Sequence, residues 1–182
     1  MESKLVLYIG KEGIRMNVTL KGEPYETNAQ APRVGDDAPS FTLKDLNDKE
    51  VKLSDLKGDV LIISTVPDIE TSTCSRQTNT FNDEARKLKG TKMFSVSTNT
   101  KAQQQEWSRT KVLHSSILHD KDRLFAKDYG LYIDNLDKMA RAVFVLNKGG
   151  QIVYREIVKE MADDPDYEAA LSAARHEEAE LN

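Results

Sequence analysis

An uninterrupted apolar, β-branched run at residues 60–66 (VLIISTV) is the feature that most constrains the fold of this chain of 182 residues. Such a run is typical of a strand buried on both faces, as in parallel sheets covered by helices. Pro67 ends the run, and three hydroxyl side chains at residues 71–73 can cap a helix. Apolar residues at helical spacing follow over residues 81–88. The sequence therefore predicts a buried strand, a short loop and a helix whose first turn contains Cys74.

Strands and helices alternate along the rest of the chain. The predicted strands lie at residues 92–97, 116–118, 140–146 and 151–154, and the predicted helices at 101–109, between Asp120 and Gly130, and from Pro165 onwards. Parallel β-α-β units that end in an antiparallel hairpin and a closing helix indicate one α/β domain with a central mixed β-sheet flanked by helices. We expect a thioredoxin-like fold, with an N-terminal β-hairpin formed by residues 16–20 and 25–27.

Composition excludes several classes of partner. The chain carries 26 basic and 30 acidic residues, a formal net charge of −4, and no basic patch of the kind that nucleic acid selects. No apolar run approaches the roughly 20 residues of a membrane span, and no signal-peptide pattern opens the chain, so we expect a cytoplasmic protein without a membrane partner. His114, His119 and His176 lack the spacing of metal ligands. We therefore expect no metal and no cofactor.

Cys74 is the only cysteine in the sequence, so it cannot form an internal disulfide. A lone buried cysteine is most often inert packing, and the alternative is that it reacts as a thiolate. A helix N-terminus favours the anion through unpaired N–H groups and the positive end of the helix dipole. Thr71, three residues earlier, could fold its hydroxyl back towards the sulfur, whereas Arg76 should point away from it.

A cation from elsewhere in the fold is needed to stabilise the thiolate, and Arg141 is the best candidate. This arginine stands at the start of a strongly apolar predicted strand, where a charge is out of place without a partner. Its planar fork can hold a thiolate and an oxygen ligand together. If the substrate is a peroxide, Thr71, Arg141 and backbone N–H groups would meet the charge that develops on the leaving oxygen, and Pro67 would shield the site from water.

The spacing Pro67-x-x-x-Thr71-x-x-Cys74 resembles the signature of the peroxiredoxins. Further local matches to their thiol peroxidase branch lie at residues 18–22, 35–43, 81–85, 127–130 and 140–146. The resemblance implies a peroxidatic cysteine at Cys74 assisted by Thr71, Pro67 and Arg141, a peroxide substrate, thioredoxin as reductant, and a homodimer. It covers residues 16–174, so we expect the domain at 16–182 and an N-terminal extension of unknown role at 1–15.

The chain departs from this branch at one position. A resolving cysteine normally follows an aromatic residue in the second helix, and here Ser108 follows Trp107. Either the protein works with one cysteine and an outside thiol, or it is a cysteine-to-serine variant of an atypical two-cysteine enzyme.

Two classes of function therefore remain open. One is a thiol-specific peroxidase that reduces hydrogen peroxide and small alkyl hydroperoxides through a sulfenic acid on Cys74. The other is a redox-sensing or binding module that uses Cys74 once per oxidation. A disulfide oxidoreductase is disfavoured because the chain has no C-x-x-C motif.

Overall fold

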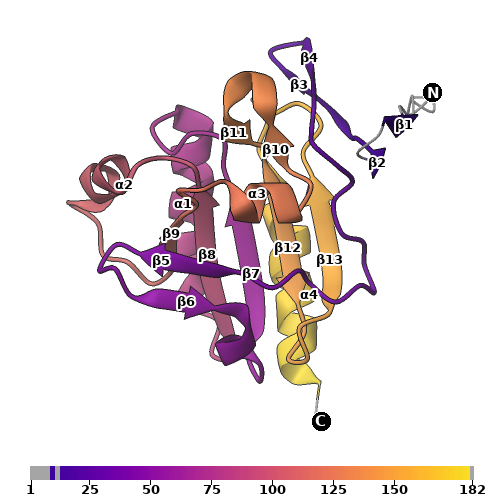
Figure 1. The fold of residues 1–182 in the computed structure, drawn as a ribbon. Helices are drawn as coiled ribbons and strands as arrows, with labels where there is room; N and C mark the ends of the chain where they lie inside the picture. Colours follow the sequence, from indigo (N-terminus) through magenta and orange to yellow (C-terminus); the bar gives the residue numbers. More distant parts are fainter. Residues whose placement is uncertain (1–8, 11–12, 181–182) are drawn as a thin grey trace.

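A seven-stranded mixed sheet forms the centre of the computed structural model, which describes residues 9–10 and 13–180 (Figure 1). The sheet order is β13-β12-β7-β8-β9-β5-β6, in which β7, β8 and β9 are parallel and the other pairs are antiparallel. The strands of this sheet are β5 (Thr42–Asp45), β6 (Glu50–Lys52), β7 (Val60–Thr65), β8 (Thr91–Ser97), β9 (Ser116–His119), β12 (Ala142–Leu146) and β13 (Ile152–Ile157). The predicted thioredoxin-like α/β fold is confirmed.

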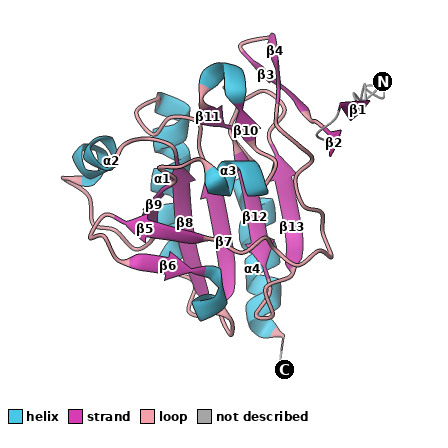
Figure 2. Ribbon diagram, in the orientation of Figure 1, coloured by secondary structure: helices cyan, strands magenta, loops and turns pink. Residues whose placement is uncertain are grey.

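Helices cover both faces of the sheet (Figure 2). The helices are α1 (Ser72–Ala85), α2 (Lys101–Ser108), α3 (Leu124–Asp128) and α4 (Tyr167–Ala179), with single 3-10 turns η1 (Leu53–Leu56) and η2 (Asp134–Leu136). Helices α1 and α4 pack on one face, where their apolar side chains form a core with Val60 and Ile62 of β7. The opposite face packs Leu61 and Ile63 against α3 and the N-terminal segments. Strand β7 is thus buried on both faces, as its sequence predicts.

The order of the strands brings three chain segments to one edge of the sheet. Strand β8 runs parallel to β7, so both end at this edge, with Thr65 beside Val96. Strand β12 runs the other way and begins there, with Ala142 beside Thr65. The residues just after β7, just after β8 and just before β12 are therefore neighbours, although they lie far apart in the sequence.

The structure differs from the sequence-based expectations at several boundaries, and two of these differences have a clear local cause. The strand expected from residue 140 begins at Ala142, because the Ala140 N–H bonds to the Leu131 carbonyl (2.8 Å) outside the main sheet. The closing helix begins at Tyr167 rather than Pro165, because the Asp166 side chain accepts a hydrogen bond from the Ala169 N–H (3.0 Å) and caps it.

Short hairpins complete the fold. The predicted N-terminal hairpin is confirmed by β3 (Asn17–Leu20) and β4 (Glu23–Glu26), and the sequence did not reveal the small pair β10 (Tyr132–Ile133) and β11 (Lys138–Met139). Within the proposed extension, β1 (Ile9–Gly10) pairs with β2 (Gly13–Ile14), whereas residues 1–8 and 11–12 lie outside the described residues. Among the described helices, none has both the length and the apolar character that a bilayer span requires.

Candidate active site

Cys74 occupies the first turn of α1, as its sequence context predicts, and only 1% of it is exposed. Its apolar neighbours come from the loop after β7 and from β9, namely Val66, Ile69 and Ile117. Leu46 and Trp107 cover the same cluster from outside and are partly buried. The sulfur is therefore shielded from bulk water, which strengthens any charged hydrogen bond made to it.

Two donors reach the sulfur. The Arg141 Nη2 atom lies 3.2 Å from Cys74 Sγ, and the backbone N–H of Asp68 lies 3.5 Å from the same atom. Arg141 arrives from the position directly before β12, and Asp68 from the loop between β7 and α1. The structure thus brings Arg141 and Cys74 together across 67 positions of sequence.

The Arg141 side chain is held in place by neutral acceptors and is only 2% exposed. Its Nε and Nη2 atoms donate to the Met161 carbonyl at 2.9 and 2.7 Å, and Nη1 donates to Gln77 Oε1 at 2.8 Å. Gln77 is itself fixed by donating to Ser64 Oγ at 2.6 Å and to the Thr65 carbonyl at 3.2 Å. Because these acceptors are uncharged, they orient the guanidinium without cancelling its charge, which remains available to a thiolate.

Arg76 points away from the sulfur, as its position two residues after Cys74 predicts. Its guanidinium donates to Asp164, with Nη2 2.8 Å from Oδ2, on the exposed side of α1. This hydrogen bond lowers the pKa of the Asp164 carboxyl. The ion pair joins α1 to the segment before α4.

Thr71 and Pro67 lie in the loop before α1. Pro67 is half-buried two positions after the end of β7, and Thr71 is the exposed residue at the N-cap position of α1, where its side chain makes no capping hydrogen bond. The Thr71 hydroxyl donates to the Asp68 carbonyl at 2.9 Å rather than towards the sulfur. Its predicted bond with sulfur or substrate stays a prediction.

Ser108 is the last residue of α2 and donates from its hydroxyl to the Gln105 carbonyl at 3.1 Å. The preceding residue, Trp107, contacts the Cys74 cluster, and its indole Nε1 donates to Ser75 Oγ at 2.9 Å. The end of α2 therefore lies against the start of α1, and position 108 adjoins the surroundings of the sulfur.

Sequence reasoning did not single out Gln77, the Met161 carbonyl or the Asp68 N–H. Gln77 had a recognisable signal, because a residue three positions after Cys74 lies on the same face of the helix. The Met161 carbonyl had none, since any backbone carbonyl can serve as an acceptor and only the folded chain shows which one does.

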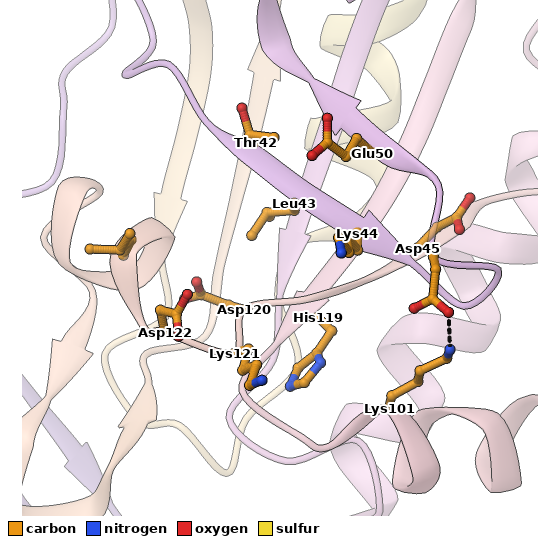
Figure 3. A pocket seen from close by; sticks show the side chains of 12 residues that line it. Thr42, Leu43, Lys44, Asp45, Glu50, Lys101, His119, Asp120, Lys121 and Asp122 are labelled. Carbon is orange, nitrogen blue, oxygen red and sulfur yellow. Dashed lines mark hydrogen bonds and ion pairs between the residues drawn. The ribbon is translucent and has the colours of Figure 1, made fainter.

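A separate cavity of about 530 Å³ lies between β5, the start of α2 and the β9–α3 loop (Figure 3). Figure 3 shows basic and acidic side chains mixed around it, and Cys74 is not among its lining residues. Lys101 is already paired with Asp48 at 2.6 Å. Burial lowers the pKa of His119 in its wall. The described residues contain no cluster of three or more histidine, cysteine or acidic side chains placed to hold a metal ion.

Comparisons with known proteins show the family of this chain. The sequence profile of the AhpC/TSA family matches residues 34–155. Proteins named thiol peroxidase from Listeria monocytogenes serotype 4b and from Bacillus subtilis are 42% and 37% identical to the chain over 160 residues. Each alignment covers 87% of this chain, and 97% and 96% of the respective relative.

Solved structures of related proteins share the fold over most of this chain. A peroxiredoxin-like protein from Aquifex aeolicus superposes with a TM-score of 0.83 at 26% identity, covering 88% of this chain and 96% of that one. A thiol peroxidase from Chromobacterium violaceum superposes with a TM-score of 0.76 at 20% identity, covering 89% and 97%, and supports the fold alone.

Proposed function

The chain belongs to the AhpC/TSA family and is a thiol-dependent peroxidase of the peroxiredoxin type, and we propose that Cys74 is its nucleophile. Membership of the family implies a peroxide substrate and a thiol reductant. The observation that carries the proposal is the 3.2 Å contact between Arg141 Nη2 and Cys74 Sγ in a site shielded from water. A buried cation beside a thiol favours the ionised, reactive sulfur.

In the proposed first step, the Cys74 thiolate attacks one oxygen of hydrogen peroxide or of a small alkyl hydroperoxide. An S–O bond forms, the O–O bond breaks, and the second oxygen leaves as hydroxide or alkoxide, which takes a proton to become water or an alcohol. Arg141, the Asp68 N–H and Thr71 stabilise the charge that moves from sulfur to the leaving oxygen. Pro67 limits the entry of water to the site. Cys74 is left as a sulfenic acid.

The second step requires a thiol from outside the chain, because the sequence has a single cysteine and serine at position 108. The outside thiolate attacks the sulfenic sulfur, so that an S–S bond forms and the S–O bond breaks, and the hydroxide that leaves takes a proton to become water; the product is a mixed disulfide. A second thiol then attacks that disulfide and returns Cys74 to the reduced state. We propose thioredoxin as the physiological donor, since its two cysteines supply both thiols.

Turnover tests this function. Reduced protein mixed with hydrogen peroxide and excess thioredoxin or dithiothreitol is expected to consume many equivalents of peroxide, whereas Cys74→Ser is expected to consume none. Consumption of a single equivalent of peroxide, with no further consumption afterwards, would instead identify a stoichiometric redox sensor. The peroxide remaining with time is the quantity to measure.

Position 108 gives a second prediction. The Ser108→Cys variant is expected to form an internal disulfide with Cys74 after peroxide treatment, because the end of α2 adjoins the start of α1 through Trp107. The intact mass under non-reducing conditions should fall by the two thiol hydrogens, without a cross-linked dimer. The matched control is Ser54→Cys, since Ser54 lies in a pocket with Leu61 near the opposite end of β7. Equal disulfide yields in both variants would contradict a role for position 108.

The proposal also covers assembly, location and domain organisation. We expect residues 16–182 to form the peroxidase domain and residues 1–15 an extension whose role is separate from the chemistry. We propose a cytoplasmic homodimer, in keeping with the family resemblance. Sedimentation equilibrium that returns the mass of a single chain at micromolar concentration would overturn the dimer.

A further inference from the structure

The loop between β7 and α1 supplies one of the two donors to the sulfur, so its conformation matters for reactivity. The Asp68 N–H points at Cys74 Sγ from 3.5 Å. The loop turns back on itself at Asp68, whose carbonyl accepts from the Thr71 N–H at 3.1 Å and from its hydroxyl at 2.9 Å. These local bonds shape the turn, but they do not attach it to the sheet.

One attachment of this loop is made by Asn99, which follows β8 and is 9% exposed. Its Oδ1 accepts from the Ile69 N–H at 2.8 Å, and its Nδ2 donates to Asp68 Oδ1 at 3.0 Å. The side-chain amide of Asn99 therefore binds the side chain of Asp68 and the backbone of the next residue, Ile69. Because β8 lies beside β7 in the sheet, the loop is fixed relative to the strand that precedes it.

These bonds are not needed to start helix α2. Thr100 caps α2 by itself, accepting from the Gln103 N–H at 3.1 Å, and Gln103 Oε1 accepts from the Thr100 N–H at 2.9 Å. This reciprocal pair completes a capping box without Asn99. Asn99 only adds a longer contact of 3.3 Å from Nδ2 to Gln103 Oε1. Its shorter bonds all go to the Cys74 loop.

Asp68 brings a negative charge close to the sulfur, and its partners control where that charge lies. Burial raises the pKa of the Asp68 carboxyl, but hydrogen bonds from Asn99, the Glu70 N–H and Lys138 outweigh it and leave the pKa lowered. Lys138 Nζ sits 3.2 Å from Oδ2, on the side of the carboxylate that Asn99 does not contact. Asn99 and Lys138 thus hold the two carboxylate oxygens, while the Asp68 N–H faces Cys74.

We propose that Asn99 is a positioning residue for peroxide reduction, acting by holding the Asp68 N–H against the Cys74 sulfur. The inference rests on Cys74 being the nucleophile. Asn99 touches neither the sulfur nor the substrate in this role. Without it, the Ile69 N–H loses its partner and Asp68 Oδ1 keeps only the Glu70 N–H at 3.1 Å, so the loop relaxes and the thiolate loses one of its two donors.

The Asn99→Ala variant tests this assignment. Peroxide reduction is expected to slow by roughly tenfold, the order of effect of losing a hydrogen bond to a charged group. The pH profile of the thiolate ultraviolet absorbance is expected to move to higher pH, and the single cysteine makes this signal specific. Asn99→Asp keeps an acceptor for the Ile69 N–H but sets a carboxylate against Asp68, so it should move the profile at least as far.

Asn82→Ala is the matched control. Asn82 is a buried asparagine on α1 that clamps a different loop, donating to the Val112 carbonyl at 2.8 Å and accepting from the His114 N–H at 2.7 Å. The Asn82→Ala variant should be less stable than the parent, but its thiolate absorbance should follow the same pH profile. An Asn99→Asp profile identical to that of the parent would overturn the inference. The parent's own turnover is measured first, so that failure of the proposed function is recognised separately.

Discussion

Replacing Arg141 by methionine is expected to slow peroxide reduction about 100- to 1000-fold, which is the effect of removing one preorganised donor from a site of developing charge. Methionine fills much of the same volume but offers no donor to Cys74 Sγ. The buried thiolate would then depend on the Asp68 N–H and the start of α1. The thiolate absorbance profile should also move to higher pH, because the cation that favours ionisation is gone.

Arg141→Lys separates charge from geometry. The guanidinium uses three nitrogens on three acceptors, the Met161 carbonyl, Gln77 Oε1 and Cys74 Sγ. A lysine ammonium cannot reproduce that planar arrangement, although it keeps the positive charge. We therefore expect its rate to lie between those of the parent and the methionine variant.

The control for both variants is Arg155→Met. Arg155 on β13 is partly buried and, like Arg141, donates to backbone carbonyls, in this case those of Ala31 at 3.1 Å and Pro32 at 2.9 Å. Its loss should lower stability and leave the thiolate profile unchanged. The measurement is the second-order rate constant with hydrogen peroxide, taken well below each variant's unfolding temperature. A rate for Arg141→Met within threefold of the parent would contradict the role given to Arg141.

The sequence could predict the strand, the helix and the place of Cys74 in the first turn of that helix because local rules decide them. The β-branched run over residues 60–66 is typical of a strand buried on both faces, and the following hydroxyls mark the start of a helix. Arg141 could be predicted because a charge in an apolar strand demands a partner, and the antiparallel pairing of β12 with β7 supplies one.

Asn99 could not be predicted in the same way, whereas Gln77 had a signal in its position three residues after Cys74. Amide side chains are common after strands, so Asn99 does not look unusual in the sequence. Its role depends on the register between β7 and β8, which places Thr65 beside Val96 and thereby brings Asn99 to the loop. The Thr71 hydroxyl shows the converse, because its spacing suggests the sulfur while the folded turn offers it the Asp68 carbonyl.

Gly130→Ala is expected to cost about 3 kcal/mol or more of unfolding free energy, from left-handed backbone strain of roughly 1–2 kcal/mol plus overpacking of roughly 1–3 kcal/mol. Gly130 follows the C-cap residue of α3 and has φ +67°, in the left-handed region. An added Cβ would lie 2.3 Å from the Gln30 carbonyl oxygen and 2.9 Å from the Ala31 nitrogen. Both are backbone atoms, so the clash cannot be relieved by turning a side chain.

Gly22→Ala separates the two costs. Gly22 has φ +84°, and an added Cβ there would meet no atom within 4 Å, so only the backbone strain of about 1 kcal/mol is expected. Urea unfolding followed by circular dichroism gives both values. Equal losses in the two variants would show that the contact with Gln30 is not tight in solution.

The clash at Gly130 should also reach the active site. Leu131, the next residue, accepts the Ala140 N–H at 2.8 Å, and Ala140 directly precedes Arg141. A shift of the backbone at Gly130 is therefore expected to displace Ala140 and, with it, the Arg141 guanidinium that contacts Cys74. At low temperature, where Gly130→Ala remains folded, its rate of peroxide reduction should fall below that of Gly22→Ala. Thr65 Oγ1 at the end of β7 also donates to the Ala140 carbonyl at 2.8 Å. Ala140 therefore connects the strand that precedes Cys74 to the residue that precedes Arg141.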